Sequence, residues 1–258
     1  MDRPEILNRL FFPRREYGEG LDVPNAMTRF VEVAPNISIG CRLYPTEKNA
    51  PNIIYFHGNG EIAPEYDYIA PVYNKRRLNL LVTDYRGYGY SGGNPTCSNM
   101  IKDAHPIFQD FVYFLKEQGY TGSLFVMGRS LGSAPAIELA YHYQLKLAGL
   151  IVESGFSSAS NQFARIGVTH LFRDSEKPIG FGNDVKIKEV YIPTLIIHGE
   201  EDEIIPVAEG KALYALSGAE EKLSLFIPHA GHNDLMTRGM EAYMAAIERF
   251  THKGNKNY

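Results

Sequence analysis

The chain has 258 residues, of which 44% are hydrophobic and 22% are charged, and its formal net charge is −4. These proportions are typical of a globular protein with one large core, and we expect one domain over residues 1–258. The negative charge, and the lack of a Lys/Arg run of five or more, argue against nucleic acid as a partner.

Strand-like and helix-like segments alternate along the chain. Short apolar, β-branched runs predict strands near 29–34, 37–43, 52–57, 78–84, 123–127, 147–152, 193–198 and 222–227. Apolar residues at helical spacing predict helices near 64–76, 99–118, 131–143, 206–217 and 233–250. This alternation predicts an α/β fold with a mostly parallel eight-stranded sheet and helices on both faces. Reactive side chains should then collect at the carboxyl ends of the strands.

Two segments depart from this alternation. The stretch of about 153–191, between the sixth and seventh strands, is expected to form a short lid. Its apolar groups either line a pocket for an acyl chain or simply cover the edge of the sheet. The candidate substrate-binding residues are Phe156, Phe163, Leu171 and Phe172. The tail at about 251–258 is expected to fray.

The cysteines, the apolar runs and the absence of metal-binding motifs predict the cellular location and the cofactor requirement. Cys41 and Cys97 give no disulfide framework, which suits a reducing compartment, and we expect a cytoplasmic protein. The first residues lack a signal-peptide core, and no 18-residue apolar run predicts a membrane span. No HExxH motif or Cys/His cluster is present, so no metal and no other cofactor are expected. The oligomeric state stays open.

The motif Gly128-Arg129-Ser130-Leu131-Gly132 is the most informative part of the sequence. It follows a strand-like run and precedes a helix-like run. A sharp strand-to-helix turn would hold the serine oxygen clear of the backbone. A side chain two residues before or after the serine would collide where strand and helix nearly touch, so glycine is required there. Ser130 is therefore the candidate nucleophile, although a serine in such a turn can also merely cap a helix.

A serine needs a base and an orienting acid, each expected just after a later strand. The strand near 193–198 leads into Glu200-Glu201-Asp202-Glu203, and the strand near 222–227 leads into His229-Ala230-Gly231-His232. Asp202 is the preferred acid, because a short carboxylate at a turn suits a fixed hydrogen bond to imidazole. His232 is preferred as the base, because His229 lies too close to the end of its strand.

Backbone N–H groups should stabilise the oxyanion that forms on the attacked acyl group. One should belong to Leu131, which follows the serine. The other should come from the loop His57-Gly58-Asn59-Gly60 after the third strand, where Asn59 is the preferred donor and Gly60 the alternative. His57 is expected to hold this loop by hydrogen bonds.

These landmarks, together with Asp84-Tyr85-Arg86-Gly87-Tyr88-Gly89-Tyr90-Ser91, resemble the α/β-hydrolase superfamily over roughly residues 28–250. The HGNG, HGEEDE and GHND stretches are most similar to its compact branch. That branch includes serine aminopeptidase-like hydrolases and α/β-hydrolase-domain-containing depalmitoylases. The resemblance implies a serine hydrolase with the order Ser, Asp, His.

We therefore expect a cofactor-free serine hydrolase that cleaves a carboxylic ester or thioester of a small-molecule or acylated substrate. A peptidase or amidase of the same fold is the alternative within enzymes. A binding or scaffold protein that keeps the fold is the alternative outside them. An intact set of Ser130, Asp202 and His232 argues against the scaffold, because binding needs no nucleophile.

Overall fold

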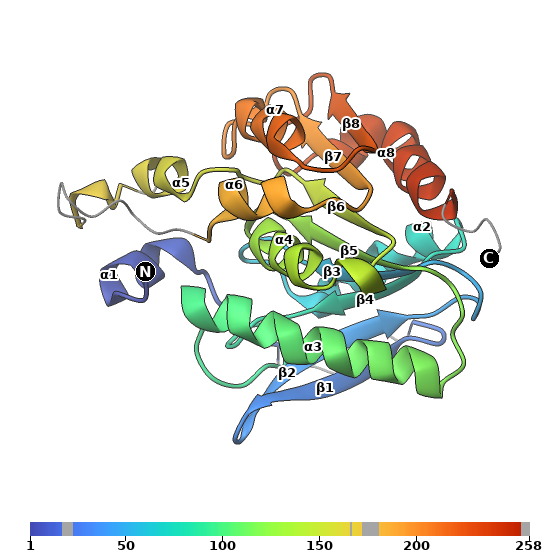
Figure 1. Ribbon diagram of the computed structural model, residues 1–258. Coiled ribbons are helices and arrows are strands. Elements are labelled where there is room, and N and C mark those ends of the chain that lie inside the picture. The colour runs from blue at the N-terminus through green and yellow to red at the C-terminus, as the bar shows by residue number, and fades with distance from the viewer. Residues whose placement is uncertain (17–22, 166, 172–180, 254–258) are drawn as a thin grey trace.

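The computed structural model describes residues 1–16, 23–165, 167–171 and 181–253. Within them, eight strands form one sheet in the order β1-β2-β4-β3-β5-β6-β7-β8 (Figure 1). The strands are β1 (Met27–Ala34), β2 (Ile37–Tyr44), β3 (Asn52–Phe56), β4 (Asn79–Thr83), β5 (Leu124–Arg129), β6 (Gly149–Glu153), β7 (Thr194–Gly199) and β8 (Lys222–Ile227). β1 and β2 pair antiparallel, and all strands from β3 to β8 run parallel. The predicted mostly parallel, eight-stranded α/β sheet is confirmed.

Helices connect these strands and cover both faces of the sheet. The α-helices are α1 (Pro4–Leu10), α2 (Ala70–Asn74), α3 (Cys97–Glu117), α4 (Ser133–His142), α5 (Ala159–Arg165), α6 (Asn183–Lys186), α7 (Val207–Leu216) and α8 (Leu235–His252). Short 3₁₀ helices are η1 (Ala63–Tyr68), η2 (Ser130–Gly132), η3 (Gln144–Lys146), η4 (Thr169–Leu171) and η5 (Ile187–Glu189).

The core has two layers, one on each face of the sheet. α3, α4 and α7 pack on one face, and α2 and α8 pack on the other (Figure 1). Strand β3 shows why both layers are apolar: Ile54 and Phe56 point into the first, Ile53 and Tyr55 into the second. Because side chains alternate along a strand, a central parallel strand buries both sets and reads as an unbroken apolar run.

Two predicted helices differ in detail. The segment near 64–76 forms η1 followed by the short helix α2, rather than one continuous helix. α8 is kinked at Gly239, whose φ of −146° is not helical. A Cβ at this position would lie 2.8 Å from Ile227 Cγ2, so close packing against β8 requires glycine there.

The prediction of a frayed tail at about 251–258 is wrong at its start. α8 continues to His252, and Thr251 is fully buried. Thr251 Oγ1 donates a hydrogen bond to Ile247 O at 2.9 Å, and His252 Nε2 lies 3.1 Å from Arg76 O. The first bond lies within α8, and the second joins the last turn of α8 to Arg76, outside this helix. Residues 254–258 lie outside the described part of the chain.

Candidate active site

Ser130 stands at a sharp turn between β5 and α4. Its backbone φ is 53°, a left-handed value that a non-glycine residue rarely adopts. A Cβ on Gly128 would lie 2.1 Å from Gly132 O, and a Cβ on Gly132 would lie 2.1 Å from Phe56 O. Both contacts are impossible, so the predicted need for two glycines is confirmed. The turn places the serine hydroxyl at the carboxyl end of the central strands.

Two loops bring His232 and Asp202 to this hydroxyl. His232 Nε2 lies 2.9 Å from Ser130 Oγ, and His232 Nδ1 lies 2.7 Å from Asp202 Oδ2. All three side chains are buried, with residue exposures of 5–8%. The rival His229 is exposed and pairs with Glu201 at 2.9 Å, away from Ser130. The structure thus joins the three residues that the sequence singled out into one chain of hydrogen bonds.

The carboxylate of Asp202 is fixed from several sides. Oδ1 accepts hydrogen bonds from Ile204 N at 2.9 Å and Ile205 N at 2.7 Å, and Oδ2 also lies 3.3 Å from His198 Nε2. Burial alone would raise the pKa of Asp202, but the hydrogen bonds from His198, His232 and Ile205 N outweigh it and lower that pKa. The group is therefore a carboxylate at neutral pH. The contact of the buried His198 with Asp202 was not predicted from the sequence.

The two candidate oxyanion residues line the same cavity as Ser130. Leu131 follows the serine in η2. The side chain of Asn59 faces the segment after α1: it donates to Leu10 O at 2.7 Å and accepts from Phe12 N at 3.0 Å. These bonds hold the loop in place next to the serine. His57 is buried in the same loop, 3.1 Å from Asp84 Oδ1, which agrees with its predicted structural role.

A cavity of about 280 Å³ opens beside Ser130 and has mostly apolar walls. Phe156 and Phe163 are in its wall, as predicted. Leu171 ends η4, but its side chain is outside the described part of the chain, and Phe172 lies wholly outside it. Phe181, another apolar residue of the predicted lid segment, is also in the wall. Four further apolar residues of the wall were not predicted: Leu10, Phe12, Ile204 and Ile205. Phe12 and Ile204 are 60% and 54% exposed, which makes the rim of the cavity apolar as well.

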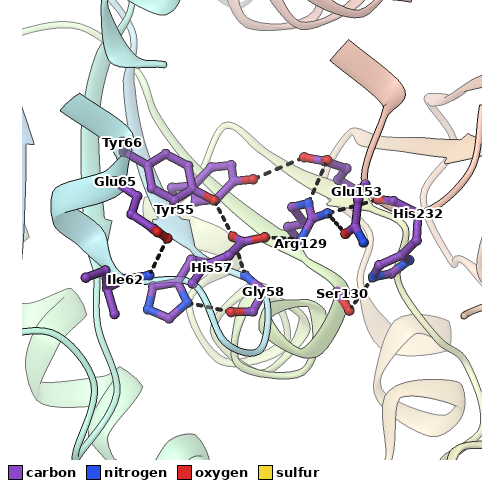
Figure 2. A network of polar contacts seen from close by, with 12 residues as sticks. Tyr55, His57, Gly58, Ile62, Glu65, Tyr66, Arg129, Ser130, Glu153 and His232 are labelled. Atoms are coloured by element: carbon purple, nitrogen blue, oxygen red, sulfur yellow. Dashed lines mark hydrogen bonds and ion pairs between the residues drawn. The ribbon is translucent and has the colours of Figure 1, made fainter. Parts of the chain in front are cut away.

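Arg129, the residue directly before the serine, joins the parts of the site (Figure 2). Its Nε donates to Glu153 Oε1 at 3.2 Å, and its Nη1 pairs with Glu61 Oε1. Its Nη2 donates to His232 O and to Asn233 Oδ1, both at 2.9 Å. One guanidinium therefore ties the loop after β3 and the end of β6 to the backbone of His232.

Each charged group of this cluster stabilises the ionised form of its partners. Burial alone would lower the pKa of Arg129, but the charges of Glu61 and Glu153 outweigh it and raise that pKa. Burial alone would raise the pKa of Glu61, but the charge of Arg129 helps to outweigh burial, and the pKa of Glu61 is lowered. Tyr66 donates to Glu61 at 2.8 Å, and Tyr243 donates to Glu153 at 2.7 Å. Arginine in a strand otherwise made of apolar residues was the sequence signal for this cluster.

A second cavity of about 410 Å³ adjoins Arg129 and His232 but does not include Ser130. Its walls carry tyrosine and methionine side chains, among them Tyr73, Met236 and Met240. The two cavities share Arg129, His232 and Asn233. The site therefore offers space on two sides of the imidazole.

Known proteins resemble this chain in sequence and fold. A family profile described as serine aminopeptidase, S33 matches residues 47–174. The chain is 28% identical over 219 residues to alpha/beta hydrolase domain-containing protein 17B of Homo sapiens, covering 82% of this chain and 70% of that protein. It is 28% identical over 194 residues to protein bem46 of Schizosaccharomyces pombe, covering 72% of this chain and 63% of that protein. The chain thus spans less than two thirds of bem46.

Among solved structures, an esterase of Pyrococcus furiosus superposes with a TM-score of 0.75 at 17% identity. The superposition covers 95% of this chain and 97% of that one, so the fold is shared almost throughout. Among the helices of the described residues, none combines the length and apolar character needed to cross a membrane.

Proposed function

We propose that this chain, which belongs to the α/β-hydrolase superfamily, hydrolyses carboxylic esters or thioesters through an acyl intermediate on Ser130. The observation that carries the proposal is the unbroken hydrogen-bond chain from Ser130 through His232 to Asp202. A serine at a strained turn with an imidazole at 2.9 Å has the geometry of an activated nucleophile.

In the proposed reaction, Ser130 Oγ attacks the acyl carbon while His232 Nε2 takes the hydroxyl proton. Asp202 accepts the Nδ1–H of His232, which fixes the imidazole tautomer and stabilises the imidazolium. The oxyanion is held by the N–H groups of Leu131 and Asn59. The C–O or C–S bond then breaks, and His232 returns the proton to the leaving group. Water, deprotonated by His232, attacks the acyl-serine and releases the acid.

The apolar cavity supports an acyl group as the part of the substrate that is recognised. Its volume of about 280 Å³ is slightly below the common range of ligand pockets, roughly 300–1,000 Å³. Phe156, Phe163 and Phe181 offer only apolar contact to a chain attached to Ser130. Each buried methylene would contribute about 0.8 kcal/mol to binding.

Peptide hydrolysis is the second candidate, favoured by the family description serine aminopeptidase. An aminopeptidase would need an acidic group to bind the amino terminus of its substrate. Among the described residues that line the two cavities, the carboxylates are Glu61, Glu65 and Glu153. Glu61 and Glu153 are both committed to Arg129, whereas Glu65 forms only a half-exposed surface pair with Arg14. The pairing of the two more buried carboxylates favours the ester proposal.

A fluorophosphonate probe and a substrate panel test the proposal. The wild-type protein should be labelled, and Ser130→Ala should not. Activity on p-nitrophenyl esters should rise with acyl length until the chain outgrows the pocket, and aminoacyl-anilides should react far more slowly. Equal rates on anilides would establish the peptidase instead. Absence of both labelling and turnover would favour a scaffold that keeps the fold.

A further inference from the structure

A second cluster of reactive side chains lies between α3 and α4, which run side by side on one face of the sheet (Figure 1). His105 of α3 faces Glu138 and His142, one turn apart on α4. His105 Nε2 lies 3.2 Å from Glu138 Oε1, and His142 Nε2 lies 3.0 Å from the same oxygen. The donor atoms of the three residues all lie within 4.8 Å of one another.

We propose that His105, Glu138 and His142 form a binding site for a divalent transition-metal ion such as Zn²⁺. Two imidazoles and one carboxylate form a ligand set that zinc commonly takes, with water completing the coordination. Ligands about 2.0–2.1 Å from a tetrahedral ion lie about 3.3 Å apart, close to the two N···O distances. No metal was expected from the sequence, because it contains no HExxH motif and no Cys/His cluster. His105 and Glu138 are 33 positions apart in the chain, so only the fold brings them together.

The surroundings of His105 prepare it for this role. A metal requires the lone pair of Nε2, so the ring proton must reside on Nδ1. His105 Nδ1 lies 3.0 Å from the hydroxyl of Tyr143, whose oxygen can accept a hydrogen bond from the Nδ1–H group. The side chains of His105 and His142 are 27% and 47% exposed, so an ion can enter from solvent.

Lys186 of α6 opposes metal binding and so provides a test of it. Its Nζ lies 2.6 Å from Glu138 Oε2 and donates to Phe181 O at 2.6 Å. The ammonium holds one carboxylate oxygen and leaves Oε1 facing the histidines. Because a nearby cation repels a metal ion, removing this charge should strengthen metal binding.

The experiment titrates ZnCl₂ into the chelator-treated protein of residues 1–258 by calorimetry. CoCl₂ absorption then serves as a second probe of the ligands. The wild type should bind one zinc ion per chain. His105→Ala and His142→Ala should each weaken binding more than tenfold, and Tyr143→Phe should weaken it about tenfold. Lys186→Met should tighten it. His229→Ala removes an exposed histidine that also pairs with a glutamate, and it should leave zinc affinity unchanged.

Wild-type affinity in both His105→Ala and His142→Ala, or no saturable binding by the wild type, would overturn the proposal. Circular dichroism establishes that each variant is folded, and Glu138→Gln provides a variant of nearly unchanged shape. The inference does not depend on the proposed hydrolase activity: Ser130→Ala should bind zinc as the wild type does.

Discussion

Replacing Arg129 with methionine should both destabilise the protein and impair the candidate active site. Methionine keeps much of the aliphatic length but leaves Glu61 and Glu153 without their shared cation. The side chains of Arg129 and Glu153 are only 12% and 5% exposed, so water compensates little for the lost charge. Removing one partner of a buried ion pair costs about 3–5 kcal/mol, and we expect a loss of that size in the free energy of unfolding.

The same substitution should disturb His232. Its carbonyl accepts a hydrogen bond from Arg129 at 2.9 Å, which fixes the loop that carries the imidazole. A misplacement of about 1 Å can cost about 10²-fold in rate, so kcat should fall about a hundredfold. KM should change much less, because the apolar walls of the cavity remain. The kcat and the free energy of unfolding of Arg129→Lys should lie between those of the wild type and Arg129→Met. An ammonium keeps the charge but cannot reproduce the forked contacts of the guanidinium.

Urea unfolding and ester kinetics on the same preparations give both magnitudes. Arg77→Met is the matched control, because Arg77 pairs with Glu47 at the surface, where the two side chains are 61% and 50% exposed. That variant should unfold and react like the wild type. If Arg129→Met also kept the wild-type urea midpoint and kcat, the reasoning about the buried cluster would be refuted.

Three further predictions concern the serine and its pocket. Ser130→Ala should lower turnover by about 10⁶-fold with an unchanged circular dichroism spectrum, and a folded, active variant would exclude Ser130 as nucleophile. Gly132→Ala places a Cβ 2.1 Å from Phe56 O. This variant should lose about 1–3 kcal/mol in the free energy of unfolding, measured by thermal denaturation. An unchanged melting temperature would contradict the close approach of the two segments. Phe163→Ala should move the optimum of an ester series toward longer acyl chains, whereas an unmoved optimum would place the acyl group elsewhere.

The sequence predicted the parts of the site that depend on local structure. The turn at Ser130 needs only a strand, two glycines and a helix, all adjacent in the chain. Asp202 and His232 follow strands of a parallel sheet, and the carboxyl ends of such strands meet at one edge. These features could be read from short segments because their neighbours in the chain determine them.

The features that were missed depend on contacts between distant segments. α1 is short and has weak helical periodicity, yet Ile6 is fully buried with Phe163 and Val168. The ion cluster of Arg129 and the cluster of His105 each join residues from separate elements. Arg129 stands out as a charge in an apolar strand, but hydrophobic periodicity along the chain does not indicate which distant residues either cluster brings together.

The pH dependence of stability separates two roles of Asp202. Burial alone would raise the pKa of Asp202, but hydrogen bonds from His198 and His232 outweigh it and lower that pKa below the unfolded value of about 3.9. A carboxyl with a lowered folded pKa stabilises the protein above its unfolded pKa, and this contribution is lost as the pH falls toward the folded pKa. The free energy of unfolding of the wild type minus that of Asp202→Asn should therefore shrink as the pH falls below about 4.

The activity of the same variant tests whether the carboxylate also orients the imidazole. Asp202→Asn should lose about 10⁴-fold in kcat at neutral pH, because an amide does not enforce the tautomer with the proton on His232 Nδ1. The neighbouring Glu201 is exposed, and Glu201→Gln should retain both wild-type turnover and the wild-type stability profile. An Asp202→Asn variant with the expected pH-dependent loss of stability but full turnover would leave Asp202 a structural role only. Its stabilising contacts would then be independent of the chemistry at Ser130.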